Sequence, residues 1–250
     1  MGIAVSAKPV YRSVQLEPSK KGRRSSTIWL ASISCRDSLS KTTWGSTSVA
    51  SASKSVEGKV GEIREPEGVK LLCGLILSEN ISFESVKAKL TEPFGPVDLE
   101  LEPFVFDFTQ YYCEEMGENL RRAFLSFERS IDPGRLAETK ALTNRLEREF
   151  GQTIEGRLRR RVNIDPGYLE ASKLVLASTK NFSHRIYLGE GIFAEVSLIF
   201  KQGRFEELEW TYPDYRAKRV KDFLLRVRER YLSQLRRDLT NGKQQTVSRE

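Results

Sequence analysis

The most constraining feature of this sequence is a strand–helix–strand pattern that occurs twice in succession. Val69–Leu77 is a dense apolar run that predicts a buried strand, and residues 81–90 place apolar side chains at helical spacing. Residues 97–108 then alternate apolar and polar positions as a strand does. The same order of elements recurs in residues 122–129, 133–150 and 158–164. This pattern predicts an α+β fold containing a ferredoxin-like split βαβ unit.

The rest of the chain predicts antiparallel hairpins followed by a helix. Strand-like segments occur at residues 173–179, 184–188, 192–200 and 205–208. Gly189, Glu190 and Gly191 predict a short turn that would place Leu188 opposite Ile192 and Ile186 opposite Ala194. Residues 213–239 carry one apolar stripe with the spacing of a helix. We therefore expect the sheet to be extended by hairpins and closed by a long C-terminal helix.

Residues 1–56 differ in composition from the remainder. They contain 14 Ser, nine basic and two acidic residues, which accounts for the whole net charge of +7. Such a segment buries too little apolar surface to fold, so we predict a disordered tail, a single domain over 57–239 and a disordered tail over 240–250. Two interpretations of residues 1–56 are open: an organelle transit peptide and a mis-called translation start.

Cysteine, histidine and motif content exclude several chemistries. The three cysteines are widely spaced, and His184 is the single histidine, so multi-histidine zinc sites and disulfide frameworks are excluded. No P-loop, dinucleotide-binding or nucleophile-elbow motif occurs, and the sequence identifies no cofactor. The longest apolar stretch of the tail is too short to cross a membrane. We expect a cytoplasmic protein with no membrane partner.

A short motif occurs twice, as Ile131-Asp-Pro-Gly134 and as Ile164-Asp-Pro-Gly167. The simplest interpretation is that each strand ends at Ile and that Asp caps a following helical turn whose first position is Pro. The alternative is that Asp165 acts as an acid, a base or a magnesium ligand.

Polar residues are concentrated in one stretch that is otherwise strand and turn. Cations near carboxylates and an amide could hold a phosphate-bearing ligand. The leading hypothesis is a binding protein for such a ligand, a nucleotide or RNA. Residues 57–150 carry a net charge of −7 and residues 151–250 a net charge of +7, which indicates either a nucleic-acid interface or two halves that attract each other in the fold. The candidate ligand-binding residues are Asn163, Lys173, Lys180, Arg185 and Tyr187, with His184 as a further cation.

Two other functions stay open. A magnesium-dependent phosphoester hydrolase would use Asp165 or Glu195 to hold the metal or act as a base, and His184 as the acid. A structural or interaction protein would use the same groups only for capping and for ion pairs, such as Arg185 with Glu195 across the hairpin.

Several long strings give the chain a family resemblance: REPEGVKLLCGLILSE, FGPVDLELEPFVFDFTQYYCEEMG, FLSFERSIDPGRL, RRRVNIDPGYLEASKLVLASTKNFSHRIYLGEGIFAEVSLIF and LEWTYPDYR. From about Arg64 to about Tyr231 the sequence resembles the uncharacterised bacterial family catalogued as domain of unknown function 4416. The resemblance implies a bacterial origin, argues against a transit peptide, and supports a domain start near Val56. It implies no activity, cofactor or catalytic residue.

Overall fold

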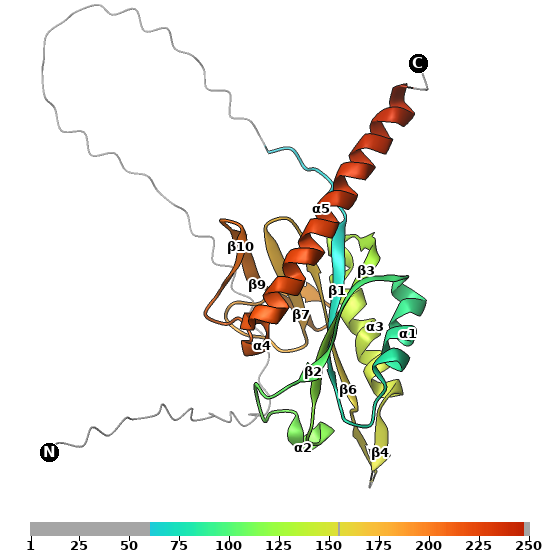
Figure 1. The fold of residues 1–250 in the computed structure, drawn as a ribbon, viewed down its shortest axis with the longest axis vertical. Coiled ribbons are helices and arrows are strands. Elements are labelled where there is room, and N and C mark those ends of the chain that lie inside the picture. Colours follow the sequence, from blue (N-terminus) through green and yellow to red (C-terminus); the bar gives the residue numbers. More distant parts are fainter. Residues whose placement is uncertain (1–60, 155, 248–250) are drawn as a thin grey trace, which may run out of the picture. The chain divides into compact units, whose positions relative to one another are not determined.

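The structure is a computed structural model that describes residues 61–154 and 156–247; the segment 1–56, predicted to be a disordered tail, is not among them. One eight-stranded antiparallel sheet has the strand order β10-β9-β7-β6-β1-β3-β2, with β8 paired to β9 (Figure 1). Its strands are β1 (Val69–Leu77), β2 (Val97–Val105), β3 (Arg121–Ile131), β6 (Val162–Leu169), β7 (Lys173–Ser178), β8 (Ile186–Gly189), β9 (Ile192–Lys201) and β10 (Arg204–Glu207).

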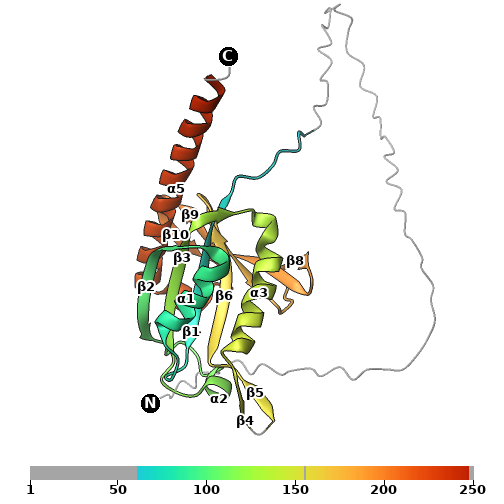
Figure 2. The same ribbon diagram turned by 90° about the vertical axis from the view of Figure 1, so that its right-hand side faces the viewer.

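Helices cover both faces of this sheet. The helical elements are α1 (Phe83–Phe94), α2 (Cys113–Met116), the 3-10 turn η1 (Pro133–Arg135), α3 (Leu136–Glu149), α4 (Pro213–Arg216) and α5 (Lys218–Val247). Helices α1 and α3 lie on one face and α5 lies on the other (Figure 2). The central strand β1 is therefore buried at every position, as its unbroken apolar sequence predicts. In the described part of the chain, no helix is long and apolar enough to cross a membrane.

The first half of the fold confirms the predicted α+β order. The elements β1, α1, β2, β3, α3 and β6 follow one another along the chain, and their strands lie in the order β6-β1-β3-β2. Ser82 caps α1 by accepting a hydrogen bond from the N–H of Ser85. Asp132 accepts one from the N–H of Gly134 at 2.7 Å, so the first Asp-Pro-Gly motif does begin a helical segment.

The second Asp-Pro-Gly motif behaves differently, and the prediction of a cap there was wrong. Strand β6 continues through Asp165, Pro166 and Gly167 to Leu169, and each of these residues pairs with β1. The predicted strand over residues 158–164 was also misplaced. Arg157–Arg159 forms β5, which pairs with β4 (Gln152–Ile154) in a separate two-stranded ribbon, and the main-sheet strand starts only at Val162. Residues 165–169 pair with β1 on one side, and from Gly167 they also pair with β7 on the other, so an extended strand is favoured over a new helical turn.

Pro166 marks the point at which β6 and β7 separate. These strands pair only over Gly167–Leu169, opposite Leu174–Leu176. Two residues before the proline, the main-chain groups of Ile164 are bonded by α3: Glu147 Oε1 accepts from its N–H and Lys140 Nζ donates to its C=O, each at 2.8 Å. Alternate residues of a strand bond to the same side, so Pro166 follows Ile164 on the β7 side with no N–H to donate. The ladder ends there.

Two further predictions require correction in the C-terminal half. In the β8–β9 hairpin, Ile186 does face Ala194 and Tyr187 faces Phe193, but Gly189 rather than Leu188 lies opposite Ile192, because the register shifts at the turn. The helix predicted over 213–239 is interrupted at Ala217, whose ψ of 135° is extended, and α5 continues to Val247, within the predicted C-terminal tail 240–250. The interruption lets the short helix α4 turn its side chains toward the sheet.

Candidate functional site

A cavity of about 620 Å³ occupies the space where β6 and β7 diverge, and we call it the β6–β7 cavity. Its walls come from β6, β7, α3, α4 and the segment that follows β2. A volume of this size is in the range of small-molecule sites, which are commonly 300–1,000 Å³. The end of the β6–β7 ladder at Pro166 thus creates a hollow inside the sheet rather than at its rim.

Aromatic and charged side chains dominate the wall of the β6–β7 cavity. Six aromatic rings line it: Phe106, Phe108, Tyr111, Tyr112, Tyr212 and Tyr215. The charged lining residues are the cations Arg122, Lys140, Arg160 and Lys180 and the carboxylates Glu147, Asp165, Glu195 and Asp214. Because the two signs are equal in number, the cavity is close to neutral before a ligand enters.

Asp165, on β6, lines the cavity and is held by two neighbours. Lys140 Nζ donates to Oδ1 at 3.2 Å, and the Asn163 amide donates to Oδ2 at 2.6 Å. The Asp165 side chain is 30 % exposed. Its carboxylate oxygens have lone pairs that these two hydrogen bonds do not use, and a ligand can donate to them. Sequence analysis named both Asn163 and Asp165, and the structure brings them together here.

Arg160 joins this cluster to the short helix α2. Its guanidinium binds Glu115 through two bonds of 2.7 Å and also donates to Glu147 at 3.1 Å and to Asn163 at 2.9 Å. Burial raises the pKa of Glu147, while the charge of Lys140 and the N–H of Ile164 act in the opposite direction. The network fixes the orientation of the Asn163 amide and hence of Asp165.

Arg122 and Asp214 form a buried ion pair, and both residues line the cavity. Arg122 Nε, on β3, lies 2.8 Å from Asp214 Oδ2 on α4. Burial alone would lower the pKa of Arg122, but the combined charges of Asp214, Tyr215 and Asp165 outweigh it and the pKa is raised. Burial also raises the pKa of Tyr112, Tyr212 and Tyr215, so these phenols stay neutral and can donate hydrogen bonds.

Glu195, on β9, is the carboxylate with the most donors. Arg185 Nε donates to it at 2.7 Å, His184 Nε2 lies 3.0 Å away, and the Ser197 hydroxyl donates at 3.0 Å. The His184 ring stacks on Trp210 at 4.6 Å between centroids, away from the cavity lining. Arg185 also donates to the hydroxyl of Tyr212 at 2.7 Å. Because Tyr212 lines the cavity and Arg185 does not, Arg185 fixes the position of a lining ring without contacting the cavity itself.

The other predicted residues divide between the cavity and the surface. Lys180 lines the cavity and donates to the Tyr111 hydroxyl at 2.8 Å. Lys173, at the start of β7, forms an ion pair with Glu170 and does not line the cavity. Tyr187 is 61 % exposed on β8, where its hydroxyl accepts from the N–H of Gly191. The structure therefore gathers Asn163, Asp165, Lys180 and Glu195 and leaves Lys173 and Tyr187 outside.

Several lining residues escaped the sequence analysis. Lys140 stands at an apolar position of the α3 stripe, and Arg122 begins the buried run of β3. For both residues, the signal in the sequence was a single cation at a position where the apolar pattern predicts burial. Phe106 and Phe108 continue the alternation predicted over residues 97–108; both pack in a hydrophobic cluster and also line the cavity, and no local pattern identified Tyr111 or Tyr212 as their neighbours.

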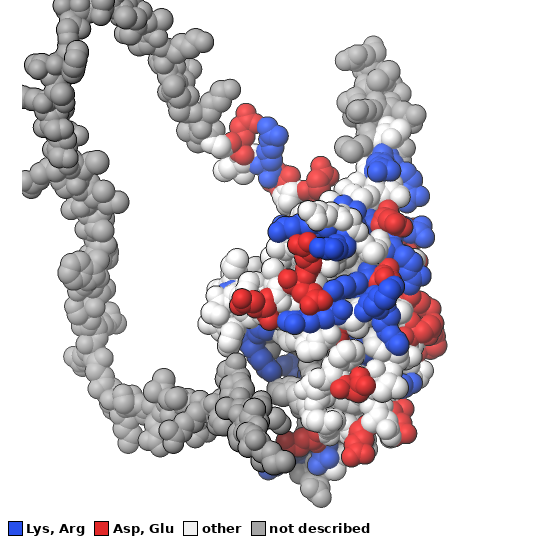
Figure 3. All heavy atoms as spheres, turned by 60° about the vertical axis from the view of Figure 1, so that its left-hand side comes forward, with Lys and Arg blue, Asp and Glu red and all other residues white. Residues whose placement is uncertain are grey.

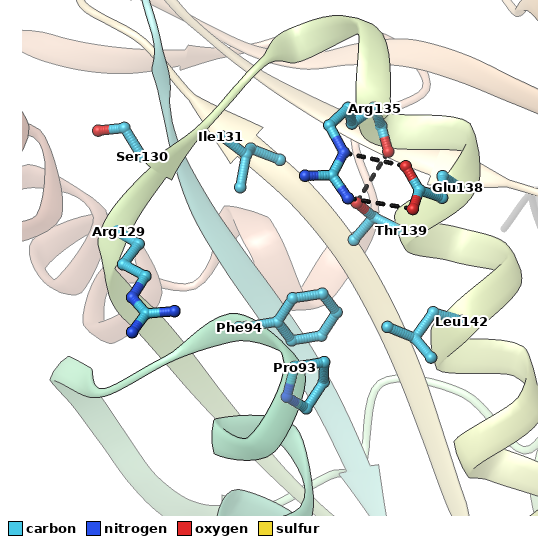
Figure 4. Close-up of a pocket in the computed structure, with 9 residues that line it drawn as sticks. All are labelled: Pro93, Phe94, Arg129, Ser130, Ile131, Arg135, Glu138, Thr139 and Leu142. Atoms are coloured by element: carbon cyan, nitrogen blue, oxygen red, sulfur yellow. Dashed lines mark hydrogen bonds and ion pairs between the residues drawn. The ribbon is translucent and has the colours of Figure 1, made fainter.

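A second hollow, of about 260 Å³, lies between the end of α1, the end of β3 and the start of α3. Figure 4 shows Arg135 turned to Glu138 of its own helix, while Phe94 and Leu142 form an apolar side of the hollow. This hollow is less than half the size of the β6–β7 cavity and falls below the usual volume of small-molecule sites, so it is the weaker candidate.

Comparison with known proteins places the chain in one family. No curated protein and no solved structure matches it. A family model described as "Domain of unknown function (DUF4416)" matches residues 67–231, which include every strand and every lining residue of the cavity. The chain therefore belongs to the DUF4416 family.

Proposed function

We propose that this chain is a binding protein for a small phosphate-bearing ligand, a nucleotide, held in the β6–β7 cavity. The observation that carries the proposal is that Lys180 has no carboxylate partner among the described residues. Arg122, Lys140 and Arg160 each have a carboxylate within 4.0 Å, whereas Lys180 has none among the described residues. An ammonium group with unused donors beside a ligand-sized cavity is suited to a phosphate.

The aromatic wall suits the other end of a nucleotide. Lys180 Nζ lies 4.4 Å from the centre of the Tyr111 ring, which in turn packs edge-on against Tyr112. A base that stacks on one of these two perpendicular rings would place its phosphate within reach of the ammonium group. Asp165 would then accept a hydrogen bond from a ribose hydroxyl or a base N–H, with Asn163 setting its orientation.

A mononucleotide is favoured over RNA. The candidate groups line one hollow of small-molecule size, and the face in Figure 3 shows basic and acidic side chains interleaved rather than a continuous basic stripe. Some of the basic side chains near the C-terminus are paired with a carboxylate, since Lys221 of α5 and Arg216 of α4 both contact Glu207 of β10. Such a surface provides little attraction for a long phosphate backbone.

The hydrolase hypothesis receives less support from the donor set. Glu195 is saturated by Arg185, His184 and Ser197, and Asp165 is bonded to Lys140 and Asn163. Within residues 61–154 and 156–247, no three His, Cys, Asp or Glu side chains are grouped to hold a metal ion. A purely structural role leaves the size of the cavity unexplained.

Three finer assignments accompany this proposal. The strand order β6-β1-β3-β2, with every pair antiparallel, supports a ferredoxin-like unit. The free thiols Cys73 and Cys113 support a reducing cytoplasm, and the family resemblance supports a bacterial origin.

Calorimetric titration of the full chain with nucleoside monophosphates tests the proposed function. Lys180→Ala should weaken binding about tenfold and flatten its salt dependence, because one charged contact to phosphate is lost. Lys173→Ala is the matched control, since it removes a lysine paired with Glu170 outside the cavity. Failure of every nucleotide to bind the wild-type chain, or equal effects of the two lysine variants, would contradict the proposal.

A further inference from the structure

Two buried hydrogen-bond donors on the cavity wall have no partner. Arg122 Nη1 and the Tyr215 hydroxyl make no hydrogen bond within the described part of the chain, and the two residues are only 1 % and 2 % exposed. Both residues line the β6–β7 cavity. Buried polar groups are almost always bonded, so a pair of orphans side by side indicates that something else completes them.

The backbone makes room for this pair at Gly74 of β1. A Cβ atom at Gly74 would lie 2.6 Å from Arg122 Nη2 and 2.8 Å from the Tyr215 hydroxyl, so both groups pack directly over this glycine. The guanidinium also stacks on Phe124, 4.4 Å from its ring centre, and Phe124 contacts the Tyr215 ring edge-on. The guanidinium, whose Nη2 is the nitrogen next to Gly74, and the Tyr215 hydroxyl are therefore packed close together over this glycine.

The positive charge of Arg122 is already balanced by the carboxylate of Asp214. Asp214 Oδ2 lies 2.8 Å from Arg122 Nε, which leaves the rest of the guanidinium as a donor but neutralises its charge. A second full negative charge would be buried without a counter-ion of its own, which is strongly unfavourable. A neutral acceptor avoids that penalty and still bonds both orphan donors.

We infer that Arg122 and Tyr215 form a subsite for a carbonyl oxygen on the ligand's base, so that the chain selects nucleotides of oxo-bases such as uracil and guanine over those of adenine. This inference rests on the proposed function. A carbonyl oxygen has two lone pairs and accepts from a guanidinium N–H and a phenol O–H together. Adenine carries an amino group in place of the carbonyl, and that donor would face two donors.

The test is a comparison of UMP, GMP and AMP binding to the full chain by calorimetry. We expect UMP or GMP to bind at least about tenfold more tightly than AMP, because AMP leaves the buried donors unpaired. Tyr215→Phe should reduce this preference about tenfold while leaving AMP affinity unchanged. The same variant should raise the denaturation midpoint of the free protein, since it deletes an unpartnered buried hydroxyl.

Tyr231→Phe is the matched control. Its hydroxyl donates to the Gly68 carbonyl at 3.0 Å outside the cavity, so its loss should lower the denaturation midpoint and leave all three affinities unchanged. Equal binding of AMP and the oxo-nucleotides, or a preference that persists in Tyr215→Phe, overturns the carbonyl subsite and leaves the proposed function intact. Competition by inorganic phosphate that depends on Tyr215 would identify an anion subsite and overturn the inference as well. If none of the three nucleotides binds, the proposed function itself fails.

Discussion

Lys140 Nζ on α3 lies 2.8 Å from the main-chain carbonyl oxygen of Ile164 on β6, where a neighbouring strand would normally donate. The same ammonium group contacts Asp165 at 3.2 Å and Glu147 at 3.7 Å. The side chain of Lys140 thus bonds a main-chain carbonyl of β6 that β7 does not pair with, and it does so at the wall of the cavity.

The first prediction concerns this lysine. Lys140→Ala should lower the free energy of unfolding by about 1–3 kcal/mol, because it leaves the buried carbonyl of Ile164 without its donor and removes one of the two cations paired with Glu147. Urea denaturation followed by circular dichroism measures the change. Arg135→Ala serves as the control, since the Arg135–Glu138 pair on the same helix is exposed and its loss should not shift the midpoint measurably. Equal midpoints for the two variants would contradict the buried-network interpretation.

The second prediction concerns Gly74. Gly74→Ala should destabilise the fold by about 1–3 kcal/mol, because the added methyl group overlaps the guanidinium of Arg122 and the hydroxyl of Tyr215. Thermal denaturation checks this value. Gly61→Ala, at a position with no atom within 4 Å of the new Cβ, should leave the melting temperature unchanged.

The third prediction concerns alkaline pH. Lys70 is buried under α5, and burial lowers its pKa below the usual 10.5 despite its ion pair with Asp98. The folded state then releases this proton before the unfolded state does, so the unfolded state binds more protons between the two pKa values and stability rises with pH.

The measurement for Lys70 is a difference between two proteins. The free energy of unfolding of wild type minus that of Lys70→Met should increase as pH rises from neutral toward 10.5. Taking the difference removes the contribution of the buried tyrosines, which titrate in the same range. A difference that falls over this range would show that Asp98 dominates over burial.

The fourth prediction concerns the thiols. Cys73 is fully buried on β1, and burial raises its thiol pKa, so it should resist alkylation until the protein unfolds. Cys113 is half-buried and should react in the native state. A Cys35→Ser background removes the thiol outside the described residues, and mass spectrometry then counts labels before and after denaturation. Rapid native labelling of Cys73 would show that β1 is accessible.

The sequence predicted the backbone elements better than it predicted their connections. The apolar run of β1, the alternation of β2 and the stripe of α5 each reflect burial on a fixed period, which can be recognised locally. The two Asp-Pro-Gly motifs show the limit of local reasoning. Asp132 caps a helical turn as expected, whereas Asp165 sits in a strand because its neighbours β1 and α3 supply the partners.

The cavity shows the same limit for side chains. Asn163, Asp165, Lys180 and Glu195 were candidates because their residue types suit a ligand, yet Lys173 and Tyr187 are of equally suitable types and face elsewhere. Arg122 and Tyr215 lie 93 positions apart and meet only because α4 turns back onto β3. No periodicity within either segment encodes that contact.

The end of the β6–β7 pairing at Pro166 divides the sheet into two halves that are joined by few hydrogen bonds. Only the pairs from Gly167 to Leu169 connect β6 to β7, so β7, β8, β9 and β10 share few hydrogen bonds with the remaining strands. We expect hydrogen–deuterium exchange to show their amides opening as one cooperative unit, ahead of β1 and β3. A ligand that bridges Lys180 and Asp165 would span this junction, so its binding should slow exchange in both halves at once.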